Sequence, residues 1–335
     1  MPFRDVIGHR RVVGLLTRSI RERSLPPSLI FAGPGGIGKR LVAVSTAQAL
    51  NCTAPGPDGD ACGVCAACSR IVRGVHPDVL LIEPGDSGSI KIDRVRDIVD
   101  RVGYRPFEGR RRVVIVDEAD ALVPAAQNAL LKTLEEPPSS SVFILITSKP
   151  DLLLATVQSR CPRLRFLGLD ASDLVAALMK RGRSEAEARA IAATADGSLG
   201  AALAASVSDF VEARDVAVRV LSQAAASGDP RRRIDLAKDL LAKTGAGGSR
   251  DREHLATNLR AMSSLLRDVE LLSVQQDGRA AALVANTDVR PAMERLTPFR
   301  GQRGVDAFAA VDRALAALEG NAGVKVVADW LVLNL

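Results

Sequence analysis

The chain has 335 residues, of which 47% are apolar and 25% are charged, and its formal net charge is +6. This length and composition allow two or three packed domains and exclude bulk disorder. No apolar run approaches the ~20 residues that a bilayer span requires, and residues 1–11 lack the apolar core of a signal peptide, so we expect a cytoplasmic protein without a membrane partner.

The first elements in chain order are a helix and a strand that leads into a glycine-rich loop. A stripe at helical spacing predicts an amphipathic helix near 12–20, formed by Val12, Leu15, Leu16, Ser19 and Ile20. The apolar run at 29–32 predicts a buried strand, and 41–50 predicts the next helix. Between them, residues 33–40 read GPGGIGKR, which is the G-x-x-x-x-G-K spacing of a P-loop in its strand–loop–helix context.

The P-loop carries the chemistry of a nucleotide site but lacks one part of it. Its glycines let backbone N–H groups face phosphate oxygens, and its lysine can reach the β- and γ-phosphates. The motif normally ends in Ser or Thr, whose hydroxyl holds Mg²⁺, and Arg40 stands there instead. We therefore predict a degenerate site for ATP or ADP, formed by Gly33, Gly35, Gly36, Gly38, Lys39 and Arg40.

A cysteine cluster follows the predicted helix. Its spacing is C-x9-C-x2-C-x2-C, formed by Cys52, Cys62, Cys65 and Cys68. Four thiolates at such spacings can hold one Zn²⁺ tetrahedrally and leave no open position, so we predict a structural zinc module over about 52–68. An iron–sulfur cluster and free thiols remain alternatives. His76 lies nearby as a possible ligand but is interpreted as a surface histidine, and metal binding is interpreted as the factor that orders the loop between the first two cysteines.

Strands and helices alternate up to about residue 166. The pattern predicts strands at 78–83, 113–116 and 142–146 and helices at 93–102 and 125–135. Continuous apolar strands that alternate with helices indicate an α/β fold, with a parallel sheet covered on both faces.

Two short motifs in this half carry possible chemistry. Residues 117–120 read DEAD directly after an apolar strand, where P-loop enzymes place an acid that holds Mg²⁺ and a Glu that polarises the attacking water. Asp117 and Glu118 are therefore candidate site residues, although acidic strand ends are common. Residues 159–161 read Ser-Arg-Cys, in which Arg160 alone is compatible with a surface salt bridge and Cys161 has no histidine partner.

The second half is predicted to be helical throughout. Short helices are expected at 170–181 and 184–194, the latter opened by a capping box at 184–187. Longer helices follow from about 207, with a glycine-rich break at 245–249. The most distinct apolar stripe joins Val305, Phe308, Val311, Leu315 and Leu318, and we predict a helical bundle.

Taken together, these motifs resemble the AAA+ proteins of bacterial clamp loaders. The likeness rests on residues 5–9 (DVIGH), the P-loop ahead of four cysteines, the DEAD segment, residues 128–138 (NALLKTLEEPP) and the Ser-Arg-Cys segment. It is dense over 1–166 and weaker beyond. It implies an AAA+ P-loop domain at 1–167, a small helical lid at 168–206 and an all-α collar at 207–335, through which the family's subunits form a five-membered ring.

The resemblance also implies roles for single residues. Arg160 matches the arginine finger that acts in trans on ATP held by a neighbouring subunit, and Thr147 matches a polar sensor in the nucleotide site. Gly200 stands where motor subunits carry a sensing arginine. The losses at positions 40 and 200 together favour a subunit that does not turn over ATP itself.

The leading hypothesis is therefore a non-motor subunit of the DNA polymerase III clamp loader, acting in DNA replication. It would join motor (gamma/tau) and delta subunits, offer Arg160 to an adjacent motor and help to load the sliding clamp on primer–template DNA. The alternatives are an ATP-hydrolysing motor subunit and a stand-alone, zinc-containing nucleotide-binding regulator. Contacts with DNA would be mainly to phosphates, and the candidate arginines are Arg94, Arg96, Arg101, Arg105, Arg110, Arg111 and Arg112.

Overall fold

The computed structural model describes residues 1–85, 87–195, 197–204, 207–242, 249–274, 284, 286, 289–320 and 322–335. The chain divides into two compact units. The first consists of Met1–Asp170 with Gly197–Gly200, and the second of Ala171–Asp196 with Ala201–Leu335. None of the helices in the described ranges is long and apolar enough to cross a bilayer.

The first unit is built on a five-stranded sheet with the strand order β2-β3-β4-β1-β5. Every pairing in it is parallel, which confirms the predicted α/β fold. The strands are β1 (Ser28–Ala32), β2 (Val79–Ile82), β3 (Arg112–Val116), β4 (Ser141–Thr147) and β5 (Arg163–Arg165). The sequence did not predict β5, because its residues Arg-Leu-Arg form no apolar run and are largely exposed at the edge of the sheet.

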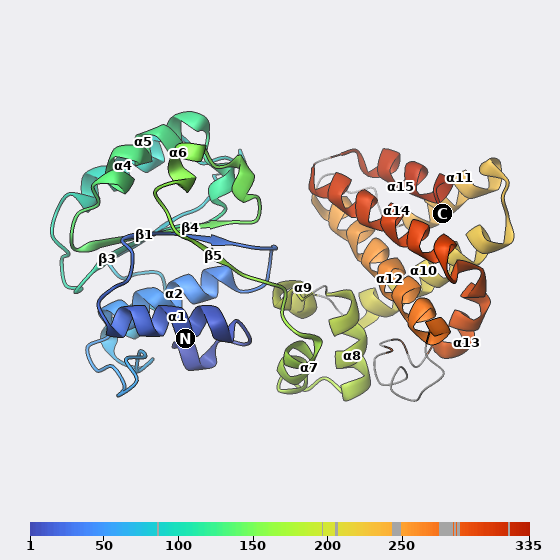
Figure 1. The fold of residues 1–335 in the computed structure, drawn as a ribbon, viewed down its shortest axis with the longest axis horizontal. Helices are drawn as coiled ribbons and strands as arrows, with labels where there is room; N and C mark the ends of the chain where they lie inside the picture. The colour runs from blue at the N-terminus through green and yellow to red at the C-terminus, as the bar shows by residue number, and fades with distance from the viewer. Residues whose placement is uncertain are drawn as a thin grey trace. The chain divides into compact units, whose positions relative to one another are not determined.

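Helices cover both faces of this sheet (Figure 1). Neighbouring side chains of a strand point to opposite faces. Phe31 and Ile144 lie in the core beneath α1 (Arg10–Arg21) and α2 (Lys39–Asn51). Ile30 and Phe143 lie in the opposite core, beneath α4 (Ile92–Val102) and α5 (Pro124–Glu135). The central strands β1, β3 and β4 are apolar along most of their length because both of their faces are buried.

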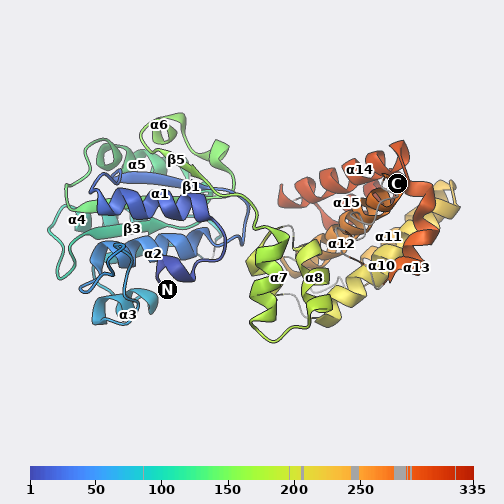
Figure 2. The same cartoon turned by 60° about the horizontal axis from the view of Figure 1, so that its bottom comes forward.

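Short elements complete the first unit. They are the 3₁₀ turns η1 (Phe3–Asp5), η2 (Ala119–Ala121) and η3 (Pro150–Leu152) and the helices α3 (Ala66–Val72) and α6 (Ala155–Gln158). Helix α3 packs against α2, on the side of α2 that faces away from the sheet (Figure 2). Within α1 the predicted stripe is only partly correct, because Val12 and Leu16 are buried whereas Leu15 is 47% exposed.

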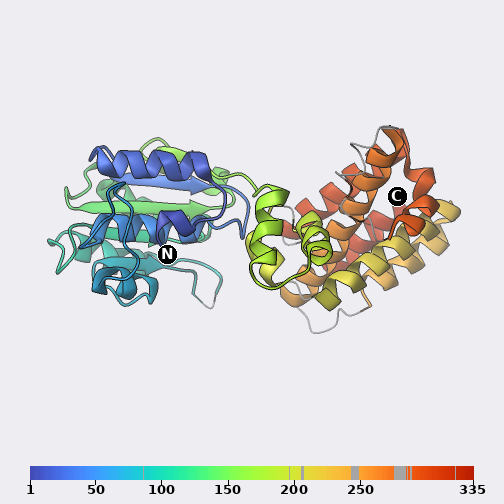
Figure 3. The same ribbon diagram turned by 90° about the horizontal axis from the view of Figure 1, so that it is seen from below.

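The described part of the second unit is helical, and its long helices pack side by side (Figure 3). Its helices and turns are α7 (Ala171–Met179), α8 (Glu185–Thr194), α10 (Val207–Ala226), α11 (Pro230–Leu240), α12 (Ser249–Val274), α13 (Arg290–Met293), η5 (Glu294–Phe299), α14 (Gln302–Glu319) and α15 (Val324–Leu333). Helix α9 (Leu199–Ala204) begins in the first unit. The capping box of α8 is confirmed, because Ser184 Oγ accepts from the Glu187 amide and the Glu187 carboxylate accepts from the Ser184 amide.

Two predictions for the second unit need correction or fall outside its described part. In α14, Val311 and Leu318 are buried, but Val305 and Phe308 are 56% and 42% exposed, since Ala307, Ala310 and Ala314 form most of the buried face instead. A search for large apolar residues overlooks a buried face made of such small side chains. The predicted glycine-rich break lies outside the described residues up to Ser249, where α12 begins.

Candidate nucleotide site and metal centre

The P-loop, the acidic segment and Thr147 meet at the carboxyl ends of the strands, where parallel α/β sheets bind their ligands. They surround a cavity of about 410 Å³. The cavity is lined by eight of the nine predicted site residues, which are Gly35, Gly36, Gly38, Lys39, Arg40, Asp117, Glu118 and Thr147. Gly33 lies just outside the lining, where its amide donates to the Thr147 carbonyl (3.2 Å) and ties the loop to β4.

Lys39 is turned onto the P-loop itself. Its Nζ donates to the carbonyl oxygens of Gly33 (2.7 Å) and Pro34, and the residue is almost fully buried. Burial lowers the pKa of Lys39, and the nearby carboxylates of Asp117 and Asp120 oppose this shift. The ammonium group therefore donates to carbonyl oxygens of the loop in this state and would have to turn outward to meet a phosphate.

Arg40 points across the cavity to the ends of β2 and β3. Its Nη1 forms ion pairs with Glu83 and with Asp117, the latter at 3.3 Å. Asp117 is the carboxylate that would hold Mg²⁺ in a complete P-loop site. In this structure the Arg40 guanidinium already pairs with Asp117. Because position 40 also lacks a hydroxyl, the residues of this site do not fit Mg²⁺. Glu83 was not predicted; the signal was an acidic residue directly after a strand.

The two remaining acids of the site, Asp120 and Glu118, differ in their surroundings. Asp120 accepts hydrogen bonds from the Thr147 hydroxyl (2.6 Å) and from the Ser148 amide (3.2 Å), which joins the acidic segment to the end of β4. Glu118 is exposed and has φ 49°, a left-handed conformation that few residues other than glycine adopt. Such strain gathers at functional sites, and Glu118 lines the cavity.

Two further segments touch the P-loop from distant points of the sequence. The Gly200 amide donates to the Gly36 carbonyl (2.8 Å), and a Cβ at position 200 would lie 3.1 Å from Gly36 Cα, so position 200 directly adjoins the phosphate loop. His9 Nε2 donates to the Ile37 carbonyl (2.8 Å), and its ring meets Phe166 edge-on. The contacts of His9 and Phe166 with the loop were not predicted.

The cysteine cluster converges as predicted from spacing. The four sulfur atoms all lie within 4.8 Å of one another, and Cys52 Sγ and Cys65 Sγ are 4.0 Å apart. Ligands in a tetrahedral zinc site with bonds of about 2.3 Å lie about 3.8 Å apart, so these four side chains fit one Zn²⁺ with little adjustment. The amides of Cys62 and Cys65 donate to the sulfurs of Cys52 and Cys62, contacts that suit thiolates.

The loop between Cys52 and Cys62 is not ordered by the cysteines alone. Asp60 is buried and accepts hydrogen bonds from the amides of Phe3 (2.9 Å) and Arg4 (3.1 Å). Arg4 in turn donates to the carbonyls of Ala61 and Cys62. The expectation that metal binding is the factor ordering this loop is therefore incomplete, because the N-terminal segment also anchors it.

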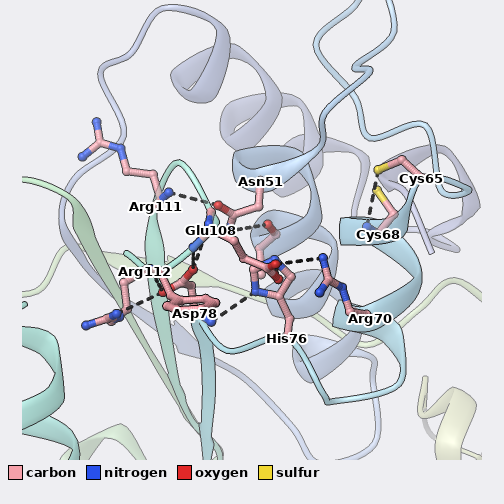
Figure 4. A network of polar contacts seen from close by, with 12 residues as sticks. Asn51, Cys65, Cys68, Arg70, His76, Asp78, Glu108, Arg111 and Arg112 are labelled. Atoms are coloured by element: carbon pink, nitrogen blue, oxygen red, sulfur yellow. Dashed lines mark hydrogen bonds and ion pairs between the residues drawn. The ribbon is translucent and has the colours of Figure 1, made fainter. Parts of the chain in front are cut away.

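A buried carboxylate organises the segment between the cysteines and β3 (Figure 4). Asp78 accepts from the amides of Phe107, Glu108 and Gly109 at 2.7–2.9 Å and pairs with Arg112 at 3.0 Å. Burial alone would raise the pKa of Asp78, but these amides and the guanidinium together outweigh it and hold the pKa at about 2. Arg70 of α3 pairs with Glu108 at 3.0 Å, which connects the cysteine module to the same network.

This network corrects two predictions. His76 is buried, not on the surface; its Nδ1 accepts from the Asp78 amide (3.2 Å), and burial lowers its pKa against the opposing effect of Glu108 and Asp78. Arg112 is buried in the ion pair with Asp78 and is withdrawn as a candidate for DNA contact. Sequence alone could not separate Arg112 from its two neighbours, because only the strand pairing determines which of the three side chains points inward.

Arg160 lies just after α6 and is one-third exposed. It pairs with Glu135 at the end of α5, and its Nη1 donates to the Thr156 carbonyl (2.8 Å). Next to it, Cys161 is buried, and that burial raises the pKa of its thiol to about 11, with Arg160 opposing the shift. The thiol therefore stays protonated at neutral pH, whereas the guanidinium sits at the surface of the unit.

Comparisons with known proteins agree with these motifs. Residues 8–170 match the family model described as "DNA polymerase III, delta subunit". The chain is 36% identical over 178 residues to DNA polymerase III subunit tau of Bacillus subtilis, covering 53% of this chain and 31% of that protein. It is 45% identical over 133 residues to subunit delta' of Pseudomonas aeruginosa, covering 39% of this chain and 40% of that protein.

The chain thus spans less than half the length of these curated relatives. A solved gamma subunit-related protein of Thermotoga maritima aligns over 95% of this chain and 96% of that one, at 20% identity and a TM-score of 0.41, and a likeness so loose adds nothing to the argument. Over residues 8–170, which contain the P-loop, the cysteines and the acidic segment, the chain is therefore similar to clamp-loader subunits of DNA polymerase III.

Proposed function

We propose that this chain is a delta-prime-type, non-motor subunit of the clamp loader. Its relatives include both a tau and a delta' subunit, so the choice between a motor and a non-motor subunit rests on the site. The observation that carries it is the ion pair between Arg40 and Asp117, 3.3 Å long, at the place where a motor needs Mg²⁺. A subunit without that metal site is not expected to hydrolyse ATP on its own.

In this proposal the chain acts on a neighbour's nucleotide. Arg160 would leave Glu135 when a motor (gamma/tau) subunit docks and would place its guanidinium against the ATP held there. A cation delivered in this way stabilises the charge that develops on the transferred phosphoryl group. Arg160 lies at the surface of the first unit, where it pairs with Glu135. A surface ion pair of this kind can break at low cost, which is compatible with that movement.

The other parts of the chain would support assembly. We assign residues 168–206 to a lid and 207–335 to a collar that joins the ring with the motor and delta subunits. The cysteines would hold a structural Zn²⁺. The complete loader would place the sliding clamp on primer–template DNA in the cytoplasm, with exposed arginines of this chain, such as Arg94 and Arg105, available to phosphates.

Turnover of ATP by the isolated full-length chain tests the proposal. We expect no Mg²⁺-dependent hydrolysis above the background given by the Glu118→Gln variant. Robust hydrolysis that disappears in Glu118→Gln would instead establish the alternative, an ATP-hydrolysing motor subunit that uses Lys39, Asp117 and Glu118.

A further inference from the structure

We propose that Arg40 is a built-in replacement for Mg²⁺, so that the cavity takes a phosphate or diphosphate group without any divalent metal. The inference rests on the proposed non-motor function and goes further, because it assigns the site a ligand class and a metal independence. The alternative is that the site no longer binds phosphate groups at all.

The first support is the position of the guanidinium. A magnesium ion in a P-loop site is held by the hydroxyl after the lysine and by the acid at the end of β3. Arg40 occupies the first of these sequence positions, and its Nη1 contacts the second, Asp117, together with Glu83. It thereby joins the start of α2 to the ends of β2 and β3, as a bound metal would join the loop to the acid.

The second support is the donors that remain. Both ion pairs of Arg40 are made by Nη1, and the structure records no bond from its Nε or Nη2 to any described residue. The side chain lines the same cavity as Gly36, Gly38 and Lys39 and is 49% exposed. A guanidinium can use one edge for carboxylates and another for phosphate oxygens, as an ammonium or a hydroxyl cannot.

The third support is the loop itself. Gly36 and Gly38 have φ 70° and 102°, conformations that glycine adopts without strain. Glycines in such conformations let a P-loop turn its backbone N–H groups toward an anion. The loop leads into α2, whose N-terminus also favours negative charge. Arg40 has therefore replaced the metal site while the phosphate cradle is retained.

The charged side chains that line the cavity limit the negative charge that a ligand can carry. The lining holds two cations, Lys39 and Arg40, against three carboxylates, Asp117, Glu118 and Asp120. Without the two charges of a metal, this set disfavours the four charges of free ATP and suits a ligand of lower charge. A divalent metal would have to displace Arg40 from Asp117, so adding Mg²⁺ should leave binding unchanged or weaken it.

Isothermal titration of the full-length chain with ADP and, separately, with inorganic pyrophosphate tests this inference. Each titration is run in EDTA and in Mg²⁺ on the wild type, on Arg40→Thr, which restores the missing hydroxyl, and on Arg18→Ser, an exposed arginine of α1 as control. For the wild type and Arg18→Ser we expect binding in EDTA that Mg²⁺ does not strengthen. For Arg40→Thr we expect affinity to rise about tenfold or more on adding Mg²⁺, because the metal regains its ligands. Binding of pyrophosphate alone would assign the site to phosphate groups, and binding of ADP alone would assign it to nucleotides.

Two results would overturn the inference. One is wild-type binding that requires Mg²⁺, and the other is the absence of binding by both compounds in EDTA. If the chain does not hydrolyse ATP, either result leaves the proposed non-motor function intact. Mg²⁺-dependent hydrolysis would contradict both the non-motor function and the metal-independent binding inferred here. Circular dichroism of each variant shows that it is folded, so a loss of binding cannot be attributed to unfolding.

Discussion

Lys39 and Arg40 are adjacent in the sequence and direct their charges to different groups of the same site. The lysine bonds carbonyls of the loop, and the arginine bonds the acids at the strand ends. Each cation thus has a partner without a ligand, although Arg40 uses only its Nη1 for these ion pairs. At the residue scale, this explains how a P-loop can keep its shape in a chain that we propose not to use ATP.

Arg160 gives the sharpest prediction for a single residue. In a loader reconstituted with motor and delta subunits, we expect Arg160→Ala to leave assembly intact and to lower ATPase activity by about 10³-fold at the affected site, the lower end of the range for trans arginine fingers. Arg160→Lys should recover little, because an ammonium lacks the guanidinium fork. Arg165→Ala, at an exposed arginine of β5, is the control. Unchanged ATPase in Arg160→Ala would refute the finger.

The lowered pKa of Asp78 predicts that the free energy of unfolding depends on pH in the acid range. Its pKa is about 2 in the folded chain, where amides and Arg112 stabilise the carboxylate against burial, and about 3.9 when unfolded. Because the folded pKa is the lower one, this stabilisation is complete above about pH 4 and is lost as the pH falls toward 2. We expect Asp78→Asn to lower the free energy of unfolding at pH 7 by about 2 kcal/mol and to flatten its acid dependence.

Urea unfolding of the full chain at several pH values measures this effect. Asp151→Asn, at an exposed carboxylate of η3, should match the wild type throughout. Equal acid dependence in the wild type and Asp78→Asn would show that the network does not stabilise the fold in this way.

At the scale of elements, the cysteine module and the N-terminal segment stabilise one another. The sulfurs converge within 4.8 Å, and Asp60 binds the amides of η1. The sequence predicted the first of these from spacing. It could not predict the second, since nothing in a lone aspartate indicates which amides it will meet.

Metal analysis tests this element. We expect about one zinc per chain, and its removal by a chelator should lower the melting temperature of the first unit, since a structural zinc contributes directly to folding. Cys65→Ser should lose the metal. Cys161→Ala, at a buried cysteine packed among apolar residues away from the cluster, should keep it. A chain that is free of metal and equally stable would contradict the structural site.

At the scale of the whole molecule, the predicted function depends on assembly. Mixed with motor and delta subunits, the full chain should co-elute with them as one complex in size-exclusion chromatography. That complex should hydrolyse ATP in the presence of primed DNA and clamp. A chain that always elutes alone would favour the stand-alone nucleotide-binding regulator.

The sequence by itself determined the parallel α/β fold, the helical second half, the P-loop, the cysteine cluster and the missing hydroxyl. Such features are local, because the spacing of apolar residues, the spacing of glycines and the residue type at one position can each be read from a short stretch of sequence. Only the tertiary structure decided that Arg40 lies on Asp117 and Glu83, that Arg112 and His76 are buried, and that alanines form most of the packed face of α14. These outcomes depend on which distant elements meet, and a side chain's partner is determined by that packing rather than by its own sequence neighbours.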